Sequence, residues 1–173
     1  MATPNYPEYT QDRYPIKEVK ALNIAIIYSE WNSEVIDPMM SSCIDTLKGF
    51  GIEENNITSF SVPGSYELPL GAKMVLGSTT KPDAVICLGC VIQGETKHDD
   101  YINHTIARGL AQLGLLSGKP VIYGVITTNN LEQAKERAGG AHGNKGSEAA
   151  QAALKMISLK EATSLSAGGK ISF

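Results

Sequence analysis

The stretch DAVICLGCVI, residues 83–92, is apolar at almost every position and lies between the turn residues Lys81-Pro82 and Gly94. A strand with one face in water alternates apolar and polar side chains, whereas a strand covered on both faces is apolar throughout. Residues 83–92 therefore predict a central strand of a parallel sheet that has helices on both sides.

Three further strand-like runs, LNIAIIYS (22–29), ITSFSVPG (57–64) and PVIYGVITT (120–128), flank this stretch, and a segment with helical periodicity follows each strand. The apolar stripes of these segments are Val35, Met39, Cys43, Leu47 and Phe50; Leu68, Ala72, Val75 and Leu76; Ile102, Ile106, Leu110 and Leu113; and Ala150, Ala153, Leu154 and Ile157. Strand followed by helix, four times over, predicts a single-domain three-layer α/β/α sandwich with a four-stranded parallel sheet. This domain is expected to span residues 21–159.

The two ends of the chain lack such periodicity. Residues 1–20 hold three prolines and three tyrosines, and they predict an extended N-terminal arm that is disordered or laid against a partner. Residues 160–173 are rich in small side chains and predict a flexible tail. Pro38 has two interpretations: a first-turn residue after Asp37, or a kink in a helix that begins earlier.

Composition excludes several classes of protein. The net charge of -3 comes without a basic patch, so no nucleic acid is expected as a partner. No apolar run is long enough to span a membrane, and the N-terminus lacks the apolar core of a signal peptide, so a cytoplasmic protein is expected. Cys87 and Cys90 form a C-x-x-C in a strand, which favours small buried residues over a redox pair. No further ligands at metal spacing accompany them, so no metal is expected.

Ligands of parallel α/β sheets bind beyond the carboxyl ends of the strands. Here this rule selects four loops, at residues 29–32, 63–67, 94–98 and 127–130. Gly94-Glu95-Thr96 precedes a helix, where free backbone N–H groups suit a phosphate, although a plain turn with a threonine cap explains the same residues equally well. His98 follows directly, and an imidazole there suits proton transfer near neutral pH.

Other side chains in or near these loops suit a flat, hydroxylated and phosphorylated ligand. Trp31 is the only tryptophan and lies in a polar loop, where its ring can stack on a heterocycle or join the core. Glu67 can accept hydrogen bonds from a polyol or complement a helix start. Arg137 and Lys145 flank a glycine-rich loop, and they suit either phosphate recognition or a solvated surface.

Four motifs, VPGSYELP, GCVIQGETKHDDYI, GVITTNNLEQAKERAGG and GNKGSEAA, together resemble the lumazine synthase family from about Asn23 to Leu159. The resemblance implies a flavodoxin-like fold and, without a cofactor, condensation of 5-amino-6-ribitylaminouracil with 3,4-dihydroxy-2-butanone 4-phosphate. The products are 6,7-dimethyl-8-ribityllumazine, phosphate and water, in the penultimate step of riboflavin biosynthesis.

The resemblance also implies roles for individual residues. His98 matches the proton-transfer residue, and Arg137 matches the arginine that binds the phosphate. Residues that match substrate-binding positions are Trp31 over the pyrimidine; Ser65, Tyr66 and Glu67 along the ribityl chain; Val91 and Ile92 along the heterocycle; Glu95 and Thr96 around the phosphate; and Tyr123 and Lys145 facing the pyrimidine from the neighbouring subunit.

Family members assemble as pentamers with interface active sites, and some form icosahedral shells of sixty chains. A homo-oligomer is therefore expected, and the loop RAGGAHGNKG lacks the longer insertion of relatives that stop at pentamers. The chain departs from the family pattern at Trp31, commonly Phe, and at Ala141, where some relatives carry a second basic residue. Three rival functions are a lumazine- or flavin-binding module without catalysis, a shell protein, and an archaeal-type riboflavin synthase, which would consume the lumazine.

Overall fold

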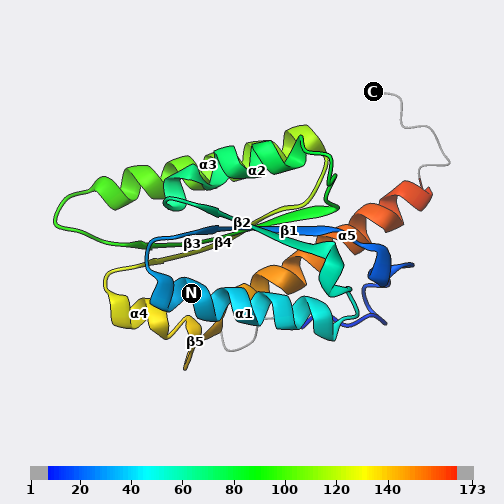
Figure 1. The fold of residues 1–173 in the computed structure, drawn as a ribbon, viewed down its shortest axis with the longest axis horizontal. Helices are drawn as coiled ribbons and strands as arrows, with labels where there is room; N and C mark the ends of the chain where they lie inside the picture. Colours follow the sequence, from blue (N-terminus) through cyan, green and yellow to red (C-terminus); the bar gives the residue numbers. More distant parts are fainter. Residues whose placement is uncertain (1–7, 167–173) are drawn as a thin grey trace.

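The four predicted strands form one parallel sheet in the middle layer of the molecule (Figure 1). The computed structural model describes residues 8–166 of the chain. The strands are β1 (Ile24–Ser29), β2 (Ile57–Val62), β3 (Ala84–Ile92) and β4 (Val121–Thr128), in the order β2-β1-β3-β4. β3 lies between β1 and β4 and is buried at every position except Ile92, which confirms the central strand predicted at residues 83–92.

Helices cover both faces of the sheet and complete the three-layer sandwich (Figure 1). α2 (Leu68–Leu76) and α3 (His98–Ser117) pack on one face. α1 (Ser33–Gly49), the short α4 (Leu131–Lys135) and α5 (Lys145–Ser166) pack on the other. The side chains of β3 alternate between the two faces: Ile86 joins the core beneath α1 and α5, and Val85 joins the core beneath α2 and α3.

Three 3-10 turns and a small hairpin connect these elements. The turns are η1 (Val19–Ala21), η2 (Glu54–Asn56) and η3 (Ser65–Glu67). β5 (Ala138–Gly140) and β6 (Gly143–Asn144) form the antiparallel hairpin that links α4 to α5. Beyond it, α5 starts so close to α1 that a Cβ on Gly146 would lie 1.9 Å from the carbonyl oxygen of Met39, so only glycine fits there.

The interior of α1 decides between the two interpretations of Pro38. The helix begins at Ser33 and runs through Pro38 to Gly49, so Pro38 belongs to a helix that begins earlier and is not a first-turn residue. The buried side chains of α1 include Val35, Met39, Cys43 and Leu47, as its apolar stripe predicted.

The N-terminal segment differs from the arm predicted at residues 1–20. Residues 1–7 lie outside the described residues, but Tyr9 is only 2% exposed and packs edge-on against Phe50, with ring centroids 4.7 Å apart. The Tyr9 N–H donates to Gln151 Oε1 at 2.8 Å, and Ile16 and Val19 are buried in the same core. From Tyr9 onward the segment is thus ordered and packs on its own α1 and α5.

The predicted flexible tail, residues 160–173, also needs correction. α5 continues to Ser166, seven residues past the expected domain end at Leu159, and Glu161 Oε2 accepts a hydrogen bond from the Lys17 N–H at 3.2 Å. Residues 167–173 lie outside the described residues. The helical part of the predicted tail therefore holds the N-terminal segment in place.

The two central strands differ in length at their carboxyl ends. β1 pairs with β3 only as far as Tyr28 and Leu88, whereas β3 continues beside β4 to Ile92. The last residues of β3 therefore have a strand neighbour on one side only. The open side is where the loops that follow β1 and β2 converge.

Candidate active site

A cleft of about 660 Å³ opens at the carboxyl ends of β1, β2 and β3, where the topology of the sheet places ligands. Three of the four predicted loops form it, whereas the loop at residues 127–130 contributes no lining residue, which corrects that part of the prediction. The cleft is lined by Trp31, Asn32, Pro63, Gly64, Ser65, Tyr66, Glu67, Cys90, Val91, Ile92, Gly94, Thr96, His98, Asp99 and Ile102.

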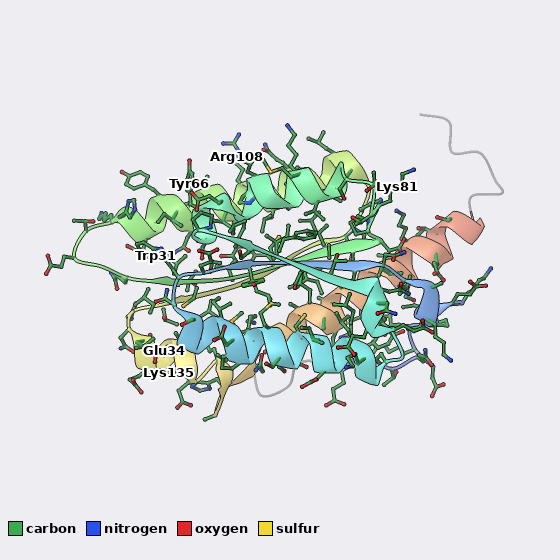
Figure 2. All side chains as sticks on the ribbon, viewed as in Figure 1. Trp31, Glu34, Tyr66, Lys81, Arg108 and Lys135 are labelled. Carbon is green, nitrogen blue, oxygen red and sulfur yellow. The ribbon has the colours of Figure 1, made fainter. Side chains whose placement is uncertain are left out.

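Two aromatic side chains on the cleft are exposed. Trp31 follows β1 and is 75% exposed, so it is not the core tryptophan that was the alternative interpretation. Tyr66, in η3, is 55% exposed, and Figure 2 shows both residues at the same end of the sheet. Such large exposed rings beside a cleft provide a stacking surface for a flat ligand.

The turn between β2 and α2 positions Glu67. Its Oε2 atom accepts a hydrogen bond from the Gly64 N–H at 3.0 Å, which closes the turn around η3. Within residues 8–166 the other carboxylate oxygen of Glu67 accepts no hydrogen bond, which leaves it available for ligand hydroxyl groups. Glu67 thus stabilises the helix start, as one of its two interpretations predicted, and it also lines the cleft.

The opposite wall of the cleft is the start of α3, a helix of 20 residues that begins at His98. Lys97, at the N-cap, makes no side-chain capping hydrogen bond, and the first backbone N–H groups of α3 have no acceptor within the helix. Asp99 and Asp100 place negative charge in the same first turn. Thr96 and His98 line the cleft, whereas Glu95 does not.

Three other predicted residues, Tyr123, Arg137 and Lys145, lie outside this cleft. Arg137 and Lys145 flank the β5–β6 hairpin, which belongs to the α1, α4 and α5 side of the sheet, whereas the cleft adjoins α2 and α3 (Figure 1). The Arg137 Nη1 donates to the Gln133 carbonyl at 2.9 Å, and Lys145 Nζ pairs with Glu148.

Tyr123 lies on β4, the edge strand, and is 39% exposed. Tyr123 is two residues from both Val121 and Val125 along the strand, so its side chain is on the same face of the sheet as theirs, which join the core beneath α2 and α3. Burial raises the pKa of Tyr123 above 10.0, so its hydroxyl is protonated at neutral pH and can donate a hydrogen bond. The predicted site residues thus fall into two groups. The cleft group lines the cleft, and the hairpin group, Tyr123, Arg137 and Lys145, lies outside it, on β4 and beside the β5–β6 hairpin.

The cysteines agree with the interpretation as small buried residues. Cys87 joins the core beneath α2 and α3, whereas Cys90 joins the core on the opposite face, so their side chains cannot form a disulfide across the strand. Burial raises the pKa of Cys90 to about 11 and that of Cys43 to about 12, which leaves both thiols protonated. Among residues 8–166 no group of His, Cys, Asp and Glu side chains could hold a metal ion.

Comparison with known proteins identifies the family. The sequence model of the 6,7-dimethyl-8-ribityllumazine synthase family matches residues 21–161. The chain belongs to this family. The match covers every element from β1 to most of α5, and it includes both the cleft group and the hairpin group.

Relatives of the same name support the assignment. The chain is similar to 6,7-dimethyl-8-ribityllumazine synthase of Cytophaga hutchinsonii, at 51% identity over 76% of this chain and 82% of the relative. It is 42% identical to that of Phocaeicola vulgatus, over 93% of this chain and 95% of the relative. It is 41% identical to that of Flavobacterium psychrophilum, over 95% and 87% respectively.

Several residues that line the cleft of this lumazine synthase family member have no role predicted from the sequence. Asn32 has a left-handed backbone (φ 62°) at the N-cap of α1, and its Nδ2 donates to the Cys90 carbonyl at 3.4 Å. An asparagine between a strand and a helix signals such a turn. Nothing in the sequence indicates that Cys90 contributes backbone atoms to the site, because this depends on the length of β3 beyond β1.

Proposed function

We propose that this chain condenses 5-amino-6-ribitylaminouracil with 3,4-dihydroxy-2-butanone 4-phosphate to form 6,7-dimethyl-8-ribityllumazine, phosphate and water. The proposal rests on family membership together with one observation, the cleft that gathers eight of the twelve predicted site residues. A stacking ring, a carboxylate, a helix N-terminus and an imidazole lie around one space. These groups match a substrate pair with a flat ring, a polyol chain and a phosphate.

The proposed binding arrangement follows the walls of the cleft. The pyrimidine stacks on Trp31 and lies along Val91 and Ile92, and the ribityl chain extends past Ser65 and Tyr66 to the Glu67 carboxylate. The phosphate of the second substrate lies at the start of α3, at Thr96 and the backbone of Glu95. His98 stands between these two sites, where protons must move during the reaction.

The chemistry requires several proton transfers. The amine of the uracil attacks the ketone, and loss of water leaves an imine. Removal of a proton from the adjacent carbon expels phosphate, and ring closure expels a second water. His98 exchanges protons in these steps, while the cleft contributes by holding both substrates in register.

The remaining residues come from a second copy of the chain in this proposal. Arg137, Tyr123 and Lys145 lie outside the cleft of their own chain, so a neighbouring subunit must present them to it. The exposed apolar surface supports such an assembly, since Leu115 and Leu116 at the end of α3 are 84% and 85% exposed. We infer a homo-oligomer, a pentamer or a 60-mer, with active sites at the subunit interfaces.

We also infer which part of the chain forms the catalytic unit and where the reaction takes place. The catalytic unit consists of the domain predicted at residues 21–159 together with the N-terminal segment and the end of α5 that pack on it, and the enzyme works in the cytoplasm without a cofactor or metal. No helix within residues 8–166 is long and apolar enough to cross a membrane.

The direct test is to mix the purified protein with both substrates and to follow lumazine absorbance and fluorescence alongside phosphate release. Protein-dependent formation of product and phosphate in equal amounts is the expected result. A rate no faster than the spontaneous reaction would contradict the proposal. If riboflavin still bound tightly, the same cleft would belong to a flavin- or lumazine-binding module.

A further inference from the structure

The end of β3 has backbone groups that the sheet does not pair. Pairing between β1 and β3 ends at Leu88, so Cys90 lacks a strand neighbour on the β1 side. Cys90 is nevertheless 4% exposed, and a buried N–H or carbonyl without a partner costs about 1–3 kcal/mol. Some other group must therefore satisfy these atoms.

Ser65 satisfies both of them. Its hydroxyl accepts the Cys90 N–H at 3.1 Å and donates to the Cys90 carbonyl at 3.2 Å. Ser65 is 7% exposed, and these two hydrogen bonds use both the proton and an acceptor site of the hydroxyl. The side chain thus replaces the strand that is missing beside Cys90.

The backbone of β3 is shaped for this contact. A Cβ on Gly89 would lie 2.7 Å from the Ser65 Oγ and 2.9 Å from the Leu68 Cδ1. The absence of a side chain at Gly89 is therefore what allows η3 to approach β3 closely. A second donor, Asn32 Nδ2, reaches the same Cys90 carbonyl at 3.4 Å.

We propose that Ser65 is a positioning residue, which acts on substrate through the β3 backbone and η3 and not through its own hydroxyl. This inference rests on the proposed function and deepens it. The two hydrogen bonds fix Tyr66 and Glu67, on the ribityl side, relative to Val91 and Ile92, on the heterocycle side. The proposed phosphate-binding site at Thr96 belongs to a different loop and does not depend on these two hydrogen bonds.

The role predicts a selective defect in Ser65→Ala. The KM for 5-amino-6-ribitylaminouracil should rise about tenfold, because the two walls that hold the pyrimidine ring and the ribityl chain are no longer fixed relative to each other. The KM for the phosphorylated substrate and the kcat at saturation should change less than twofold, by roughly the scatter of such measurements.

Ser158→Ala is the matched control. Ser158 is also a buried serine, 5% exposed, and its hydroxyl donates to the Pro15 carbonyl at 3.1 Å, far from the cleft. Both variants lose one buried hydroxyl, but only Ser65→Ala should change a KM. Equal KM values in the two variants, or an equal rise for both substrates of Ser65→Ala, would overturn the inference.

A second measurement separates this role from the proposed function. Trp31 is the only tryptophan, so its fluorescence reports riboflavin binding at the cleft whether or not product forms. Riboflavin should bind Ser65→Ala about tenfold more weakly than wild type and Ser158→Ala. Unchanged affinity overturns the inference, as does a wild type that neither binds riboflavin nor makes lumazine. If Ser65→Ala does not fold, Ser65→Cys replaces it, because a thiol fills the same space but makes only weak hydrogen bonds; the expected and contradicting results are the same.

Discussion

The backbone N–H of Lys145 donates to the carbonyl oxygen of Arg137 at 2.9 Å, so the two cations are held at adjacent positions of one hairpin. α4, which precedes the hairpin, is tied to α1 by the ion pair between Lys135 Nζ and Glu34 Oε2 at 2.8 Å (Figure 2). In the proposed assembly the hairpin presents both residues to the same neighbouring chain. In the proposed function these two cations reach the phosphate and the pyrimidine of a single site.

Replacing Arg137 with Gln should weaken binding of the phosphorylated substrate most. The guanidinium donates two parallel hydrogen bonds to phosphate, and position 141, where some relatives carry a second basic residue, is Ala141 here and cannot compensate. We expect the KM for that substrate to rise about 30-fold or more, since one charge-assisted hydrogen bond contributes about 2 kcal/mol. Arg108→Gln, on the outer side of α3 (Figure 2), is the control and should leave both KM values unchanged. Equal effects of the two variants would contradict the role of Arg137.

Replacing His98 with Ala should lower kcat without abolishing the reaction. General acid–base catalysis by one side chain accelerates a reaction about 10²-fold, or somewhat less where holding the two substrates together also accelerates it. His98 is exposed at the start of α3, so the fold should tolerate the change. Turnover is followed by lumazine absorbance, with His104→Ala, at a position further along α3 that does not line the cleft, as the control. Unchanged turnover of His98→Ala would remove the proton-transfer role.

The ring of Trp31 should contribute to product affinity. Trp31→Phe keeps an aromatic ring but reduces the stacking area, so riboflavin and 6,7-dimethyl-8-ribityllumazine should bind about threefold to tenfold more weakly. Trp31 is 75% exposed, so the substitution should change the free energy of unfolding only slightly. Calorimetric titration measures the affinity without tryptophan fluorescence, and Tyr101→Phe, an exposed aromatic outside the cleft, is the control. Equal affinity of Trp31→Phe and wild type would show that ring size is unimportant.

The N-terminal segment should stabilise the fold of its own chain. Tyr9→Ala removes a buried ring from the core and should lower the free energy of unfolding by about 3 kcal/mol. Tyr101→Ala, at a position that is 74% exposed, should change it by less than about 0.5 kcal/mol. Urea unfolding measures both. If the two variants were equally stable, the packing of this segment on α1 and α5 would be wrong.

The same tyrosine should also make stability depend on pH. Burial, and then the negative charge of Glu161, raises the pKa of Tyr9 above 10.0. A group whose pKa is raised by folding stabilises the fold below its unfolded pKa and loses that contribution as the pH rises through the folded value. Wild type should therefore lose more stability than Tyr9→Phe above pH 10, and parallel curves would contradict this.

The sequence predicted the sheet well because buried parallel strands have a distinct pattern. Each of the four strands was found to within two residues of its observed bounds, and the apolar helical stripes lie on helices except for Phe50, which follows α1. The N-terminal segment was missed because Tyr9, Ile16 and Val19 enter the core singly, without periodicity, from a proline-containing stretch. Helix α5 extends beyond its apolar stripe, since residues 160–166 are exposed or partly exposed as far as their burial is described.

The residues that line the cleft were predictable where single loops determine their positions. Trp31, Glu67 and Thr96 each follow a strand or precede a helix, and the topology brings those positions together. The contact between Ser65 and Cys90 was not predictable, because it depends on the register in which β3 extends past β1. The division of the site into two groups follows from the side of the sheet on which the hairpin packs, which no local pattern encodes.

The central claim, a condensing site completed by a second copy, is tested most directly by mixing two impaired variants at substrate concentrations where each alone has little activity. Glu67→Ala damages the cleft group, and Arg137→Ala damages the hairpin group. If one chain supplies the cleft and another the hairpin, co-expressed variants should regain about a quarter of wild-type activity, because about a quarter of random interfaces combine two intact halves. Lumazine formation by the mixed assembly, compared with each variant alone, is the measurement. Activity no greater than that of the separate variants would contradict the account.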